Sequence, residues 1–132
     1  MKSMIRESNE IDMNDLKTKL ENTFYKYFPN CTVDINPFKD DDGRDVLAIK
    51  AFSACPSYER TAENSRMYMD LFVTFGSLGI FMASYGCIVY PPSGRKPEKV
   101  GFINGVVNSA VDIVRRFDAL CKRFDKTYKF WY

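Results

Sequence analysis

The residue types that perform chemistry are sparse in this chain of 132 residues. It contains no histidine, which excludes Ser-His and Cys-His nucleophile pairs, histidine general bases and histidine-containing zinc sites. Asp, Glu, Cys, Lys and Tyr remain, but none of them lies in a motif that would activate it. We therefore expect no catalytic residue, no metal site, no cofactor and no enzymatic activity.

The four cysteines, Cys31, Cys55, Cys87 and Cys121, show no CxxC spacing. The first residues lack the apolar segment of a secretory signal, and the longest mostly apolar run, 78–90, is too short to cross a bilayer as a helix. We expect a cytoplasmic protein that does not contact a membrane, with reduced thiols that act as small buried hydrophobes. Structural disulfides or a zinc site are the alternative.

Two short polar motifs resemble ligand sites without matching their spacing. Asp40-Asp41-Asp42-Gly43 fails the EF-hand pattern, because Gly43 at loop position 6 would place Phe38 at position 1 and Ile49 at position 12. Its composition is that of a solvated hairpin turn. Gly94-Arg95-Lys96 lacks the spaced glycines and the Ser/Thr of a P-loop. It is a basic loop in which Arg95 and Lys96 are candidate anion contacts.

Positive charge is concentrated in the C-terminal third of the chain. Residues 1–90 carry 10 Lys/Arg and 13 Asp/Glu, whereas residues 91–132 carry 9 and 4. Three acids in a helix here would each lie four residues before a base, in the stabilising orientation: Asp112, Asp118 and Asp125. Arg115, Arg123 and Lys126 are left unmatched, and they are candidate contacts for nucleic acid or another anionic ligand. A solvated helix face is the ordinary alternative.

Hydrophobic periodicity predicts the two helices that would position these residues. Apolar residues recur every three or four positions near the C-terminus, which predicts a helix over about 101–127. Its expected core residues are Val107, Val114, Phe117 and Phe124. A second helix is predicted over 12–28, with Asp12 as its N-cap and Pro29 after its end.

Alternating and apolar segments predict four strands, at 32–36, 46–52, 67–75 and 80–90. Pro37 confines the first strand to an edge or ends it early. We expect a single domain over 1–132, with 1–10 as a flexible lead-in. The order α-β-β-β-β-α predicts an α+β two-layer sandwich, in which the helices pack on one antiparallel four-stranded sheet.

The third and fourth strands form the strongest predicted hairpin. A two-residue loop, Ser77-Leu78, would pair Phe75 with Ile80, and regular pairing would then bring Met69 opposite Gly86. The other face of this hairpin would carry four aromatic side chains: Tyr68, Phe72, Phe81 and Tyr85. A one-residue slip would exchange the two faces.

The aromatic face is the strongest candidate for partner binding. If both helices cover the opposite face, these rings are exposed, and exposed aromatic sheet faces bind proteins, stack on bases or form oligomer contacts. Alternatively, a helix or the loop 55–65 covers them. The aromatic C-terminal tail adds Trp131, which either binds a partner or packs on the sheet.

These observations favour a small non-catalytic interaction protein of inhibitor, immunity, counter-defence or adaptor type. It would bind a macromolecular partner, most simply a protein, through the aromatic sheet face and the C-terminal helix and tail. A homodimer is a further form of association for this face. The alternative is a binder of nucleic acid or a phosphorylated small ligand that uses the basic C-terminal part of the chain.

Overall fold

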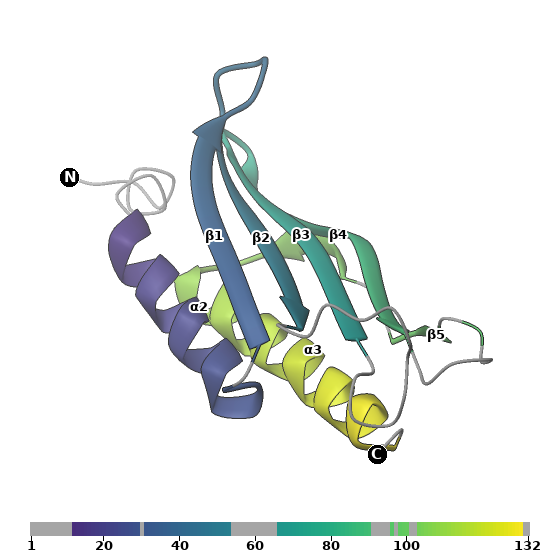
Figure 1. Ribbon diagram of the computed structural model, residues 1–132. Coiled ribbons are helices and arrows are strands. Elements are labelled where there is room, and N and C mark those ends of the chain that lie inside the picture. The colour runs from purple at the N-terminus through teal and green to yellow at the C-terminus, as the bar shows by residue number, and fades with distance from the viewer. Residues whose placement is uncertain are drawn as a thin grey trace.

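The computed structural model describes residues 12–29, 31–53, 66–90, 96, 98–100 and 103–130. In chain order the elements are α2 (Met13–Tyr27), β1 (Cys31–Lys39), β2 (Asp45–Ser53), β3 (Arg66–Gly76), β4 (Gly79–Tyr90), β5 (Glu98–Lys99), β6 (Asn104–Val107) and α3 (Ala110–Phe130). The strands form one antiparallel sheet, and both helices lie across one of its faces (Figure 1). This confirms the predicted α+β sandwich. Residues 1–10, the loop 55–65, Arg95 and Trp131 lie outside the described residues.

The sheet is wider than predicted, because two short strands extend it beyond the four long ones. The long strands lie in the order β1-β2-β3-β4, and both β5 and β6 pair with the outer edge of β4. The sequence prediction placed 104–107 inside the C-terminal helix, which was wrong. Val107 pairs instead with Ile80 of β4, and Ser84 Oγ accepts a hydrogen bond from the backbone N–H of Ile103 at 2.9 Å.

A local capping arrangement explains why α3 begins at Ala110. The N–H of Asp112 donates to Ser109 Oγ at 3.2 Å, and the Asp112 carboxylate accepts from the N–H of Asn108 at 3.1 Å. These bonds satisfy donors that have no partner within the helix, as in a capping box. At the start of α2, the predicted N-cap is confirmed: Asp12 Oδ1 accepts from the N–H groups of Asn14 and Asp15.

The core lies between the helices and the sheet. The fully buried large side chains come from both layers: Leu16, Leu20, Phe24, Ile35, Leu47, Ile49, Met69, Leu71, Met82, Phe117 and Phe124. The prediction was correct for Val107, Phe117 and Phe124, but Val114 is only partly buried. Ile113, the preceding residue, is completely buried. The helix is therefore rotated about its axis relative to the predicted stripe.

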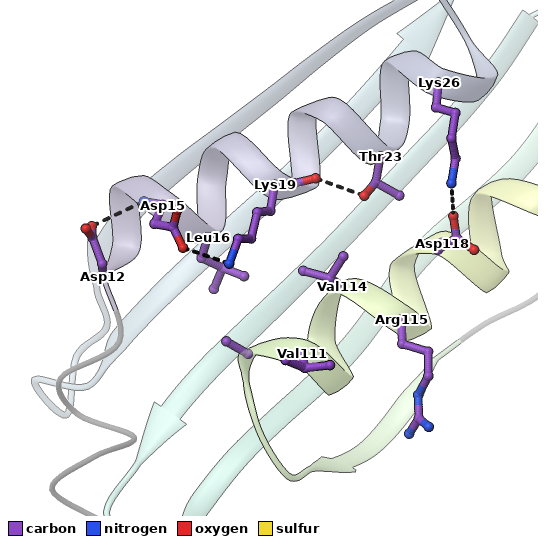
Figure 2. Close-up of a pocket in the computed structure, with 11 residues that line it drawn as sticks. Asp12, Asp15, Leu16, Lys19, Thr23, Lys26, Val111, Val114, Arg115 and Asp118 are labelled. Atoms are coloured by element: carbon purple, nitrogen blue, oxygen red, sulfur yellow. Dashed lines mark hydrogen bonds and ion pairs between the residues drawn. The ribbon is translucent and has the colours of Figure 1, made fainter.

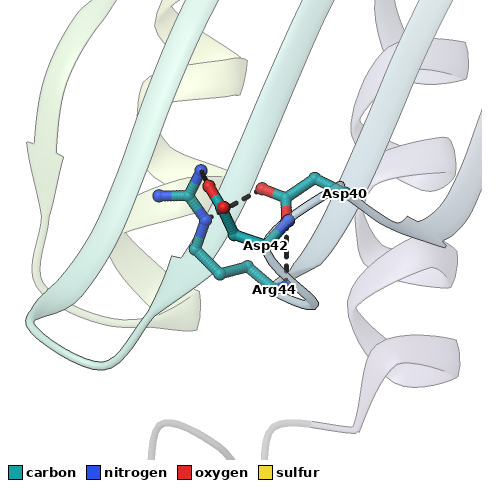
Figure 3. Close-up of polar contacts among 3 residues, drawn as sticks. All are labelled: Asp40, Asp42 and Arg44. Carbon is teal, nitrogen blue, oxygen red and sulfur yellow. Dashed lines mark hydrogen bonds and ion pairs between the residues drawn. The ribbon is translucent and has the colours of Figure 1, made fainter.

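The acidic segment after β1 forms a tight turn. Oδ1 of Asp40 accepts from the N–H groups of Asp42 and Arg44, and Oδ2 accepts from Arg44 Nε at 2.8 Å (Figure 3). The bond from the Arg44 backbone is the main cause that lowers the pKa of Asp40. Gly43 has a φ of 79°, which glycine adopts without strain. The Asp40 carboxylate thus organises the hairpin.

A β-bulge shifts the register of the β3–β4 hairpin. The predicted pairs Phe75–Ile80 and Leu71–Ser84 are confirmed. Beyond an irregularity at Asp70/Leu71, however, Met69 pairs with Cys87 instead of Gly86. The extra residue on β4 keeps Cys87 on the helix-covered face and leaves both Tyr85 and Gly86 between two core-facing residues.

Candidate functional site

We define the open face as the side of the sheet away from the helices. Alternation along the paired strands places on it Thr32, Asp34, Asn36 and Phe38 of β1, Val46, Ala48 and Lys50 of β2, Tyr68, Asp70, Phe72 and Thr74 of β3, Phe81, Ala83, Tyr85 and Ile88 of β4, and Asn104 and Val106 of β6. All four aromatic residues singled out from the sequence belong to this face.

A contiguous aromatic cluster occupies the middle of the open face. The Phe72 ring packs edge-on against Phe38 and Tyr85, with ring centroids 6.3 and 5.2 Å apart. Phe38 and Phe81 are each 44% exposed and Tyr85 is 74% exposed. These values are high for large aromatic side chains, which proteins usually bury. The cluster therefore forms an accessible apolar surface.

Tyr68 is held differently from the other three aromatics. Its ring lies over Gly86, where a Cβ atom would approach a ring carbon to 3.2 Å. Its hydroxyl donates to Oδ2 of Asp70 at 3.2 Å, and the other carboxylate oxygen of Asp70 is buried and accepts no hydrogen bond. The absence of a side chain at Gly86 makes room for the ring. Tyr68 thus packs along the sheet and is only partly exposed.

Two of the exposed large apolar residues on the open face were not identified from the sequence. Phe38 was missed because the predicted strand stopped at residue 36. Pro37 was expected either to confine this strand to an edge or to end it early, and the first holds: β1 continues to Lys39 as an edge strand. Its alternation with Val33 and Ile35 would have placed it on this face. Val106 is 63% exposed. The sequence had assigned it to a helix, so its pairing with Phe81 could not be predicted.

Charge on the open face is balanced. Asp34, Lys50 and Asp70 form one row across β1, β2 and β3. Lys99 of β5 pairs with Ile88 and adds a second base at the edge. Within the described parts of the chain, Lys50 has no ion-pair partner. Among the side chains that the structure describes, the face therefore combines an apolar centre with two acids and two bases, and these four carry no net positive charge.

A second depression lies between the two helices, on the side away from the sheet. It has a volume of about 520 Å³, with Leu16, Ala110, Val111 and Val114 among its apolar lining residues (Figure 2). Charged side chains around it form ion pairs with each other: Lys19 pairs with Asp15, and Lys26 pairs with Asp118. We call it the inter-helix groove.

Asp118 links the two helices at one end of this groove. Its Oδ1 accepts from Lys26 Nζ at 2.8 Å and from the Tyr27 hydroxyl at 2.9 Å. The Lys26 bond is the main cause that lowers the pKa of Asp118. The sequence had instead matched Asp118 with Lys122 along the helix. The side chains of Lys26 and Asp118 are 61% and 37% exposed, so the ion pair contributes modestly to stability.

The lowered pKa of Asp118 predicts a pH-dependent effect. A carboxylate with a folded-state pKa below its unfolded value of about 3.9 stabilises the protein above that pH and loses its effect as pH falls through the folded pKa. We expect Asp118→Asn to lower the melting temperature by about 1–3 °C at pH 7, and to have almost no effect at pH 2. Melting followed by circular dichroism at the two pH values measures this. An equal deficit at both pH values would contradict the ionic contribution.

The basic residues of α3 are only partly free. The prediction left Arg115 unmatched, which was wrong: its guanidinium forms an ion pair with Asp112, and Arg116 contacts the other oxygen of the same carboxylate at 3.3 Å. These guanidiniums and the Asn108 N–H lower the pKa of Asp112, the Arg115 bond being the largest cause. Arg123 and Lys126 are exposed on α3, as is Lys96 before β5.

The described thiols and carboxylates offer no activated nucleophile and no metal ligand cluster. Burial raises the pKa of the Cys87 thiol to about 11 and also raises that of Cys121, so both are protonated at neutral pH. Cys31 is only partly buried. Among the described residues, no group of three or more Cys, Asp or Glu side chains is placed to hold a metal ion.

Comparison with known proteins adds no relative: no family model, curated protein or solved structure matches this chain. In the described part of the chain, neither helix is sufficiently long and apolar to span a membrane. The candidate site therefore depends on the geometry of the open face alone.

Proposed function

We propose that this chain is a small non-catalytic interaction protein that binds a protein partner through the open face of its sheet. It would act in the cytoplasm as an inhibitor-like, immunity-like, counter-defence or adaptor domain. The observation that carries the proposal is the aromatic cluster in which Phe72 packs between the exposed rings of Phe38 and Tyr85, with the exposed Phe81 on the same face. Aromatic side chains at the centre of a patch and polar residues at its margin are typical of protein interfaces.

The balanced charge of the open face favours a protein over a nucleic acid. Binding to phosphates depends on several unpaired bases, whereas this face carries Lys50 and Lys99 together with two acids. On α3, Arg115 is neutralised by Asp112. Arg123 and Lys126 remain as contacts for the alternative function, an anion binder that would be weak and strongly dependent on salt.

Quantitative affinity capture from a cytoplasmic extract of the source cells tests the proposal. We expect the wild-type chain to enrich at least one protein, and the double variant Phe81→Ser/Tyr85→Ser to retain less than about a tenth of it, because two of the three exposed rings of the interface are removed. The matched control is Val111→Ser. It also removes an exposed apolar side chain, 76% accessible, but from the inter-helix groove.

The control separates the two candidate surfaces. Capture lost in the open-face variant and kept in the Val111→Ser variant supports the proposal. The opposite pattern would assign the interface to the inter-helix groove. Salt-dependent binding of a labelled single-stranded oligonucleotide that is lost in Arg123→Ala/Lys126→Ala, with no protein captured through the open face, would favour the anion binder instead.

A further inference from the structure

We infer that the partner that fits the open face is a second copy of this chain, bound face to face about a two-fold axis. This inference rests on the proposed function, because it needs the open face to be a protein interface. The two sheets would form the inner layers of a four-layer dimer, with the helices outside. Sheets that pack face to face lie about 10 Å apart, with mean strand directions within about 30° of each other.

The register of the sheet makes the open face complementary to itself. A two-fold axis that lies in the plane of the face, between β2 and β3 and parallel to them, exchanges β2 with β3 and β1 with β4. Ala48 and Phe72 are neighbours in one row across these strands. The axis therefore brings the small Ala48 over the partner's Phe72, and the reverse, so that large side chains meet small ones.

The adjacent row supplies matched charges. Lys50 and Asp70 are paired across β2 and β3, so the same axis places Lys50 opposite the partner's Asp70, twice in each dimer. In the described chain Lys50 has no ion-pair partner, and Asp70 accepts a single hydrogen bond, from Tyr68. One strand further from the axis on each side, in the row beyond Ala48 and Phe72, Phe38 of β1 meets the partner's Phe81 of β4. The charges that balance within one face thus also complement each other between two faces.

The size of the face sets the strength of the dimer. Strand spacing gives a width of about 19 Å over the four strands that the axis exchanges, and seven residues of β1, 32–38, extend about 24 Å along it. Two such faces together bury on the order of 1,000 Å², the lower limit for a specific interface. We therefore expect dissociation in the micromolar range and use chain concentrations of about 100 μM, where such a dimer is populated.

The test measures the mass of the purified full-length chain by light scattering during gel filtration. We expect twice the mass of one chain for the wild type and for Val111→Glu, and a monomer for Phe81→Glu. The single variants Lys50→Asp and Asp70→Lys should each weaken self-association at least about tenfold, because like charges then face each other in both copies of the pair. An equimolar mixture of the two variants should recover the dimer, since both cross-pairs become complementary.

Recovery in the mixture is the decisive result, because charge neighbours within one chain cannot produce it. Circular dichroism confirms that each variant is folded. If Asp70→Lys does not fold, Phe38→Lys mixed with Phe81→Glu replaces the pair, since the same axis joins these positions. A monomeric wild type, a dimer that survives Phe81→Glu, or charge variants that fail to complement each other would overturn this inference. The capture experiment with the Phe81→Ser/Tyr85→Ser variant decides the proposed function separately.

Discussion

Replacing Ile49 by aspartate is expected to abolish cooperative folding. Ile49 is completely buried in β2, between its pairing partners Ile35 and Leu71 and beneath the helices. An unpaired carboxylate there costs several kcal/mol even after relaxation, and a domain of this size is stable by only about 5–15 kcal/mol. Thermal and urea melts followed by circular dichroism should show no sigmoidal transition.

The residue before it provides the matched control. Ala48 points to the open face and is half-buried, so Ala48→Asp should fold and lose about 1 kcal/mol, the cost of aspartate in a strand. Both melts are recorded at a few micromolar chain. The pair of variants tests whether only one face of the sheet is covered. If Ala48→Asp also fails to fold, the open face is core and the interaction surface proposed for it does not exist.

Truncating Phe117 to alanine is expected to lower the free energy of unfolding by about 3–5 kcal/mol, the usual cost of removing a fully buried aromatic ring. The Phe117 side chain is completely buried in the core that α3 forms with the sheet. Urea denaturation gives the value directly, and the slope with denaturant should not change because the same surface is exposed on unfolding.

Val111, six residues earlier on the same helix, is the comparison for Phe117. It is 76% exposed, so Val111→Ala should change stability by no more than about 0.5 kcal/mol. Equal effects of the two substitutions would mean that α3 is rotated away from the orientation described here. The comparison also tests the orientation of α3 in the structure. There Val114 lies at the edge of the core, whereas the sequence had predicted it inside the core.

The sequence predicted elements that are specified by local chemistry. The helix α2 is bounded by its own residues, with Asp12 as N-cap and Phe28 as C-cap. The Gly43 turn is likewise encoded in a few adjacent positions. In both cases the hydrogen bonds that fix the backbone are made within about four residues, so the pattern alone carries the information.

The errors arose where distant pairing overrides a local pattern. Residues 104–107 fit a helical stripe, yet they pair with β4, and Ser84 holds the preceding Ile103 in place. The bulge in β4 is also invisible to alternation, because it is defined by the partner strand. The four aromatic residues could still be assigned to one face, since β3 has no extra residue and the alternation of β4 is regular from Phe81 to Tyr85. Their exposure could not, because it depends on where both helices pack.

The two edges of the sheet determine whether one molecule can add a strand to another at high concentration. On one side β1 contains Pro37, which removes a backbone donor from the middle of the strand. On the other side β5 and β6 occupy parts of the rim of β4. One edge strand therefore lacks a backbone N–H donor, and the edge of β4 is partly covered by short strands. Such edges pair poorly with the extended strand of another chain. Growth by strand addition, which leads to fibres, is thus disfavoured, even though the open face exposes aromatic side chains.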